Sequence, residues 1–156
     1  MWTPIIVAGG GALFLGLFGG LMTPIGPWYR SLVKPRLQPP NWLFGPAWTI
    51  ILGLAAWSAV TAWNAAPDAS ARTDVIILFL TNALFHALWS PLFFRMRRPD
   101  WALTEVVFLW ASLVALVVGL WPISPFASLL ILPYLLWVSF AAWLNYAIVR
   151  LNGPFG

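Results

Sequence analysis

The sequence contains no cysteine, few charged side chains and a single histidine, and each shortage excludes a class of protein. Without cysteine the chain has no disulfide framework and no thiolate that could hold a metal. One histidine, His86, cannot build a multi-histidine cluster, so no metal site is expected. Charged residues make up 8% of the chain, against roughly 25% in soluble globular domains. The chain therefore has too little polar sequence to be a soluble domain.

Apolar side chains are abundant instead, and they make up 62% of the 156 residues. A helix needs roughly 20 mostly apolar residues to cross about 30 Å of hydrocarbon. Stretches of this kind are separated by proline, glycine and polar residues, and no alternating pattern of β-strands is present. They cover residues 5–23, 44–65, 74–94, 101–121 and 126–149. We therefore expect one membrane domain, residues 1–156, an all-α bundle of five transmembrane helices in an integral, multi-pass protein.

The basic residues are distributed unevenly between the predicted loops. Three lie in the first loop, three lie between residues 95 and 98, and Arg150 lies near the C-terminus, while Arg72 alone falls on the opposite side. By the positive-inside rule, the N-terminus is outside and the C-terminus is cytoplasmic, as in a bacterial cytoplasmic-type membrane. Membrane orientation thus explains the net charge of +4, and no nucleic-acid partner is expected.

The first loop, residues 24–43, is unusually long for a connection between two helices. Long connections in compact domains are often lids or binding loops. Length alone leaves two interpretations open, a cap over a pocket and a merely extended connector.

Small residues recur on one face of the first predicted helix, at Ala12, Gly16 and Gly20. Such spacing lets two helix backbones approach closely. We expect close packing inside the bundle, with a seam between two copies of the chain as the alternative.

Polar and aromatic residues share one face on each of two predicted helices. These residues are Asn82, His86, Trp89 and Phe93 on the third helix, and Tyr134, Trp137, Ala141 and Asn145 on the fifth. Polar groups facing lipid are costly, so both faces should point into the bundle. Together with Trp48 they converge beneath the first loop as a ligand pocket. A packed aromatic core with interhelical hydrogen bonds is the alternative, and His86 is expected to form hydrogen bonds rather than ligate a metalloporphyrin.

One acidic residue, Glu105, lies one turn inside the fourth predicted helix. We expect its side chain to reach the cytoplasmic surface or to pair with Arg95, Arg97 or Arg98.

Several motifs follow one another in order along the chain. They are WYxxLxKP at residues 28–35, PPxWxFxPxWT at 39–49, LWSPLFF at 88–94, PYLLW at 133–137 and LNY at 144–146. This set closely resembles the TspO/MBR family, the tryptophan-rich sensory proteins related to the mitochondrial translocator protein. The resemblance covers nearly the whole chain.

The resemblance implies a five-helix bundle, often a homodimer, that binds porphyrins such as protoporphyrin IX and other lipophiles such as sterols. Porphyrin is then a ligand, and no cofactor is expected. The first loop would cap a pocket in the cytoplasmic half. Trp48 and Trp137 match family tryptophans tied to porphyrin binding and its light-dependent breakdown. Other pocket positions are matched by Tyr29, Trp42, Trp89 and Asn145.

Three positions depart from the family pattern. Asn82 and His86 stand where relatives commonly carry Gln and Asn, and Leu37 stands where many have Trp. We expect the Asn82–His86 pair and Leu37 each to shift ligand preference. At the water edge, porphyrin propionates could pair with the basic residues of the first loop, which are Arg30, Lys34 and Arg36.

The leading functional hypothesis is a membrane receptor or sensor that binds tetrapyrroles and helps to regulate their metabolism. A transporter of tetrapyrroles or lipids is the main alternative, although the spans show no inverted repeat and no charged relay. Two further classes are an enzyme that degrades porphyrin in light, through Trp48 and Trp137, and a scaffold without a small ligand. The expected partners are a lipophilic small molecule, membrane lipid and a second copy of the chain.

Overall fold

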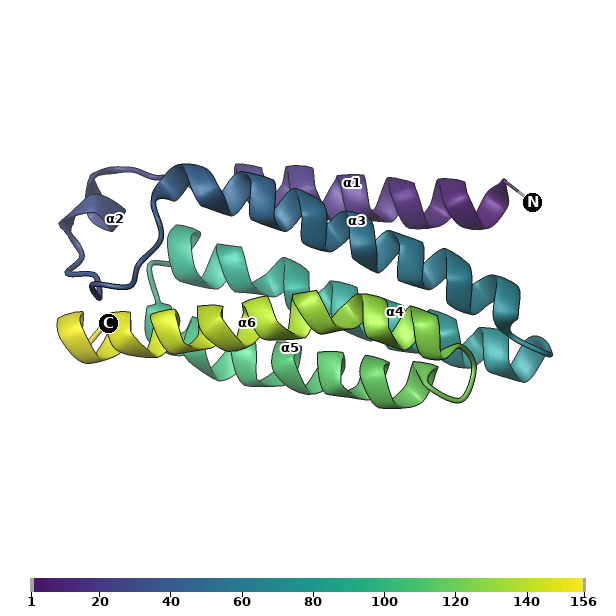
Figure 1. The fold of residues 1–156 in the computed structure, drawn as a ribbon. Coiled ribbons are helices and arrows are strands. Elements are labelled where there is room, and N and C mark those ends of the chain that lie inside the picture. Colours follow the sequence, from purple (N-terminus) through teal and green to yellow (C-terminus); the bar gives the residue numbers. More distant parts are fainter. Residues whose placement is uncertain (1, 156) are drawn as a thin grey trace.

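The computed structural model describes residues 2–155 and shows a bundle of long helices (Figure 1). Five helices are long and apolar enough to cross a membrane. They are α1 (Thr3–Leu21), α3 (Asn41–Ala65), α4 (Ala69–Ser90) continued by the π-helix η1 (Pro91–Arg95), α5 (Pro99–Leu120) and α6 (Pro125–Asn152). No strand occurs in the described residues. The prediction of an all-α membrane protein with five transmembrane helices is confirmed.

Each of the five helices begins before the apolar stretch from which it was predicted. The start of α4 lies at Ala69, five residues before the predicted start, because the Asp68 carboxylate accepts a hydrogen bond of 2.8 Å from the Ala71 backbone N–H. Similarly, the Ser124 hydroxyl accepts one of 3.2 Å from Ala127 at the start of α6. Hydropathy locates the part of a helix in lipid, whereas capping side chains decide where the helix begins.

The core of the bundle lies where α5 packs against α6 and α4. Leu113, Leu116 and Ile131 are fully buried there. By contrast, α1 packs mainly against α3 at one side of the bundle and contains no buried residue (Figure 1). The bundle is therefore tight around α5 and looser behind α1.

The two glycines on the small-residue face of α1 differ in how closely α3 approaches them. A Cβ atom added at Gly20 would meet nothing within 4 Å, and at Gly16 it would meet Leu52 at an ordinary 3.7 Å. At Gly119 of α5, in comparison, an added Cβ would lie 2.9 Å from Leu78. The expectation of close packing is wrong for Gly20, whose missing side chain leaves open space, whereas Gly16 lies at ordinary contact distance from α3. A seam between two copies stays a prediction.

The long first loop contains a short helix, α2 (Pro27–Ser31), and lies over one end of the bundle. The Tyr29 ring packs on Phe94, with 5.3 Å between ring centroids. The Asn152 side chain at the end of α6 accepts from the Val33 N–H and donates to the Val33 carbonyl, at 2.7 Å each. The loop is thus held to α6 and to η1.

The two ends of the bundle differ in charge. Figure 1 shows the first loop, the α4–α5 connection and the C-terminus at one end, and the N-terminus with the α3–α4 and α5–α6 connections at the other. The first group of segments carries all basic residues except Arg72. The chain therefore has the charge separation of an oriented membrane protein. Which end faces the cytoplasm stays a prediction.

Candidate functional site

A cavity of about 730 Å³ lies beneath the first loop, between α1, α3, α4 and α6. Its volume falls within the roughly 300–1,000 Å³ of small-molecule sites. Eight of the predicted site residues line it. They are Tyr29, Trp48, His86, Trp89, Phe93, Trp137, Ala141 and Asn145.

Three indole rings form much of the aromatic wall of this cavity. The centroids of Trp48 and Trp137 are 6.2 Å apart with their planes at 85°, and Trp48 meets the His86 ring edge to face at 4.9 Å. The Trp89 ring stacks on Phe93 at 5.0 Å. Edge-to-face and offset contacts are the stable arrangements of aromatic pairs. The rings therefore hold one another in place and offer both faces and edges to a ligand.

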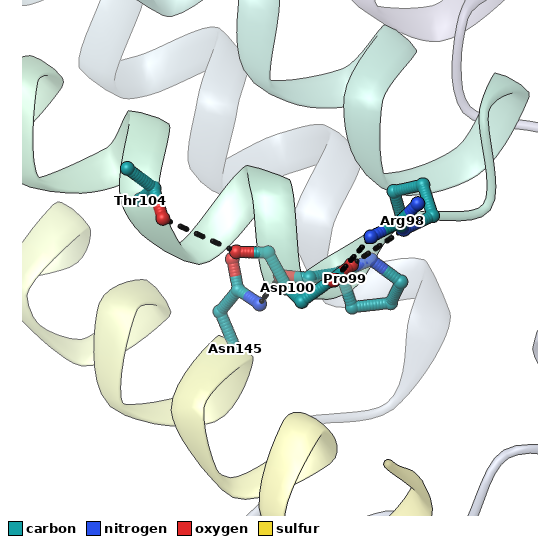
Figure 2. A network of polar contacts seen from close by, with 5 residues as sticks. All are labelled: Arg98, Pro99, Asp100, Thr104 and Asn145. Carbon is teal, nitrogen blue, oxygen red and sulfur yellow. Dashed lines mark hydrogen bonds and ion pairs between the residues drawn. The ribbon is translucent and has the colours of Figure 1, made fainter. Parts of the chain in front are cut away.

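Asn145 connects three helices at the loop end of the cavity. Its Oδ1 accepts a 3.0 Å hydrogen bond from the Trp89 indole N–H on α4. Its Nδ2 donates a 2.9 Å hydrogen bond to the Pro99 carbonyl at the start of α5 (Figure 2). This hydrogen bond ties α6 to the first residue of α5 in a buried place, so it stabilises the junction. Asn145 thus orients Trp89 as part of the cavity wall.

The start of α5 also carries the one ion pair found within residues 2–155. Arg98 and Asp100 approach to 2.6 Å, and Thr104 on the next turn contacts the Asp100 carbonyl (Figure 2). The hydrogen bond to Asp100 raises the pKa of the Arg98 guanidinium. Arg98 is therefore not available to Glu105.

The prediction for Glu105 is wrong. Its side chain is buried, and neither carboxylate oxygen has a hydrogen-bond partner within the described part of the chain. Arg98 pairs with Asp100, and Arg95 donates to the Leu21 carbonyl at 2.9 Å. Glu105 faces the core of the bundle because of its position on α5, so it cannot extend toward the surface.

The polar face of α4 is divided between two cavities. His86 lines the first cavity, and its Nδ1 lies 2.6 Å from the Tyr134 hydroxyl. Tyr134 and Asn82 line a second cavity instead, and the Asn82 amide donates to Ser112 at 3.3 Å. His86, Trp89 and Phe93 thus line the predicted cavity, whereas Asn82 and Tyr134 do not.

Four other predicted residues also lie off the cavity lining. Trp42 is 71% exposed at the first turn of α3. Arg30 and Arg36 are exposed on the first loop. Lys34 donates hydrogen bonds to the carbonyls of Tyr29 and Leu32, at 2.8 and 3.2 Å, and partial burial lowers the pKa of its ammonium group. Lys34 therefore lies next to the cavity through Tyr29.

Gln38 is a lining residue that sequence reasoning missed. Its Nε2 donates a 2.9 Å hydrogen bond to the Tyr29 hydroxyl. Burial raises the pKa of the Tyr29 phenol, and this hydrogen bond opposes the rise. The only signal in the sequence was a polar amide inside a loop predicted to cover a pocket.

Two buried polar atoms of the cavity wall have no hydrogen-bond partner within residues 2–155. They are the indole nitrogen of Trp137 and Oε1 of Gln38. Buried polar groups are nearly always paired, so these two are available to a ligand. The donor and the acceptor belong to α6 and to the first loop.

Many of the other lining residues are small or aliphatic and carried no polar or aromatic signal. They include Gly16, Gly19 and Gly20 of α1 and Val106 and Leu109 of α5. A search for polar faces cannot find positions whose contribution is empty space or a methyl group. Within the described residues, no group of three or more His, Cys, Asp or Glu side chains could hold a metal ion.

Comparison with known proteins decides the family. The profile of the TspO/MBR family matches residues 5–151. The chain belongs to the TspO/MBR family. It is 37% identical to the "Tryptophan-rich protein TspO" of Chlorobaculum tepidum over 149 residues, which cover 90% of each chain. It is 32% identical to the "Tryptophan-rich sensory protein" of Cereibacter sphaeroides, over 86% of this chain and 82% of that one.

A eukaryotic relative belongs to the same group. The human "Translocator protein" is 31% identical over 126 residues, which cover 80% of this chain and 75% of the human one. The TspO/MBR family, which the ordered motifs predicted, is therefore confirmed. The motifs surround the cavity, since they contribute Tyr29, Trp48, Trp89, Trp137 and Asn145 to its lining.

Proposed function

We propose that this membrane protein is a receptor or sensor that binds a porphyrin or a similar flat lipophile in the cavity beneath the first loop. The observation that carries the proposal is a cavity of about 730 Å³ lined by three indole rings. Within residues 2–155, the Trp137 indole N–H and the Gln38 amide oxygen on its wall have no hydrogen-bond partner. A mostly apolar site with a few directed polar groups is typical of small-molecule binding.

The chemistry of the wall matches a tetrapyrrole. Its flat macrocycle would gain stacking and edge contacts from Trp48, Trp89 and Trp137. Its propionates would extend past Tyr29 toward the basic first loop, where Lys34 lies next to the Tyr29 ring, 4.4 Å from its centroid. Sterols and other lipophiles would use the same apolar wall without these charge contacts.

A sensing role follows from the anchoring of the first loop. Tyr29 lines the cavity and packs on Phe94, while Val33 is hydrogen-bonded to Asn152 at the end of α6. A ligand that touches Tyr29 and Gln38 would favour one position of the loop over others, and a receptor shifts its conformations only by such differential contact. The occupied protein would then present a changed surface at this end of the bundle.

One observation favours transport as a second candidate. A neighbouring cavity shares Ala12, Leu15 and Leu52 with the first and extends toward the other end of the bundle. Flux of a porphyrin into proteoliposomes that exceeds passive leakage would support transport, and binding without flux would support sensing.

The proposal is tested by titrating protoporphyrin IX into the purified protein in detergent and following the porphyrin Soret absorbance. We expect saturation near one porphyrin per chain. Trp137→Phe removes the unpaired indole N–H and should weaken binding by up to about tenfold. Trp57→Phe is the matched control, because Trp57 is 54% exposed and lines neither cavity. Binding that does not saturate, or that both variants weaken equally, would contradict the proposal.

A further inference from the structure

We propose that the second cavity binds one acyl chain of an anionic phospholipid, with the lipid phosphate at Arg72. This cavity has a volume of about 650 Å³ and lies between α1, α3 and α4, at the end of the bundle opposite the first loop. The lipid proposal does not depend on the porphyrin proposal. The two cavities share three lining residues, and the rest of the second cavity is lined by other turns of these helices.

Small side chains create the space in this second cavity. Ala8 and Gly11 of α1 face Ala56 and Ala59 of α3 across it. A Cβ atom added at Gly11 would meet nothing within 4 Å. Small residues in membrane helices usually allow close helix contact. Here the missing side chains leave a space between packed helices that is open to another molecule.

The length of the cavity matches one leaflet of a bilayer. On α4 the lining extends from Arg72 to Ala83, which lie eleven positions apart, about 16 Å along the helix. The hydrocarbon core is about 30 Å thick, so half of it is about 15 Å. A chain whose phosphate lies at Arg72 would therefore end near the bilayer centre.

The deep end of the cavity presents polar atoms that are already paired. Asn82 donates to Ser112, and the Tyr134 hydroxyl contacts His86. An apolar chain end there would contact the ring of Tyr134 without leaving a polar group newly unpaired. A hydrocarbon chain is thus compatible with a wall that contains Asn and Tyr side chains.

Charge complementarity identifies the headgroup. Arg72 is the one basic residue at this end of the bundle, and its guanidinium lies 4.8 Å from the centroid of the Trp63 ring. Within residues 2–155 it forms no ion pair. The nearby Asp68 carboxylate is used by the Ala71 N–H, and neither Asp68 nor Asp74 lines the cavity. Arginine favours phosphate, and each basic residue near an anionic membrane surface adds attraction.

The depth of the cavity argues for a lipid chain over a helix from a second copy. The lining reaches Tyr134, which is only 1% exposed in the middle of the bundle. A helix is about 10 Å wide with its side chains and could cover the opening, but it could not enter between α1 and α4 as far as Tyr134. A single hydrocarbon chain can.

Photo-crosslinking tests the proposal. The protein is placed in phosphatidylcholine nanodiscs that contain a small fraction of phosphatidylglycerol with a diazirine in its acyl chain, and adducts are mapped by mass spectrometry after irradiation. We expect adducts on the residues of α1, α3 and α4 that line the second cavity. Unlabelled phosphatidylglycerol should compete for them much better than unlabelled phosphatidylcholine or free palmitate.

Two variants and two matched controls make the test specific. Arg72→Gln should lower labelling by phosphatidylglycerol about tenfold, whereas Arg97→Gln, at the other end, should not. Ala59→Leu should fill the cavity and abolish its adducts, whereas Ala115→Leu, at an exposed position of α5, should not. All four variants should retain saturable protoporphyrin binding if the first cavity is the porphyrin site.

Three results would overturn the lipid site. Adducts spread over all lipid-facing helices, unaffected by the variants, would indicate ordinary annular lipid. Crosslinks between two chains across the opening would show that a second copy covers it. Competition by palmitate and not by phosphatidylglycerol would exclude a phospholipid. Loss of porphyrin binding with an intact adduct pattern would refute only the proposed function.

Discussion

The hydroxyl of Tyr134 and the Nδ1 atom of His86 lie 2.6 Å apart, and this contact joins the walls of two cavities. His86 lines the cavity beneath the first loop, and Tyr134 lines the one between α1, α3 and α4. The two spaces are therefore neighbours separated by a single layer of side chains. A substitution in this layer should therefore alter the walls of both cavities.

Tyr134→Phe removes the hydroxyl and leaves His86 Nδ1 without this partner. Interhelical hydrogen bonds in membranes average about 0.6 kcal/mol and reach about 1.7 kcal/mol. The free energy of unfolding should therefore fall by about 0.6–1.7 kcal/mol. Unfolding in mixed detergent micelles measures it. Tyr146→Phe is the control, because the Tyr146 hydroxyl accepts a hydrogen bond from Arg150 at an exposed place. Equal losses of unfolding free energy in the two variants would show that the buried contact stabilises the protein no more than the exposed one.

Gly20→Leu should block the first cavity without unfolding the protein. The added side chain meets no atom at its Cβ and extends into space lined by Gly20. Leucine is also the better helix former by nearly 1 kcal/mol, so stability should be unchanged or higher while porphyrin affinity falls at least about tenfold. Gly10→Leu, at an equally open position that lines neither cavity, should bind as the unmodified protein does. Unaltered binding in Gly20→Leu would place the porphyrin elsewhere.

Asn145→Ala should destabilise the junction of α4, α5 and α6. It leaves the Trp89 indole N–H without its partner and removes the hydrogen bond that ties α6 to Pro99, which costs about 1–3 kcal/mol. Thermal unfolding in detergent should show the loss, and weaker porphyrin binding should accompany it as Trp89 becomes free to turn. Asn64→Ala, at an exposed position of α3, serves as control.

Glu105→Leu should raise stability, because it removes a buried carboxyl group that has no partner in residues 2–155. The relief should be about 1–3 kcal/mol in the free energy of unfolding. Glu105→Gln keeps a polar group in the same place and should gain little. A loss of stability in Glu105→Leu would mean that the carboxyl group has a partner, such as water or a ligand.

Light should destroy a bound porphyrin if Trp48 and Trp137 act as oxidisable neighbours. Both indoles line the cavity, 6.2 Å apart. Illumination of the complex should then bleach the Soret band faster than for free porphyrin in the same detergent, and Trp48→Phe or Trp137→Phe should slow it. Trp57→Phe should not, because Trp57 lies outside the cavity. Equal bleaching with and without the protein would exclude this activity.

Several site residues were predictable because helix periodicity is a local property. Trp89 and Asn145 were placed on inward faces by the cost of polar groups in lipid, and the structure joins them by a hydrogen bond of 3.0 Å. The same rule could not separate Asn82 from His86. Both face inward, and only the packing of Tyr134 against His86 decides which cavity each one lines.

The glycines of α1 show the limit of sequence reasoning most clearly. Small-residue spacing predicts contact when the neighbouring helix approaches, but the approach depends on every other contact in the bundle. At Gly119 the neighbour is close, and at Gly20 it is absent. The same residue type therefore has opposite roles in α5 and α1.

The sequence by itself determined that the chain lies in a membrane, that it crosses five times as helices, and which helix faces turn inward, because hydropathy and periodicity act within each segment. Only the tertiary structure decided that α1 packs mainly against α3, that two cavities lie beside it instead of one, and that Glu105 is buried with no hydrogen-bond partner in residues 2–155. These features depend on distances between segments far apart in the chain. Packing around α5 and α6 sets those distances, and no single helix encodes them.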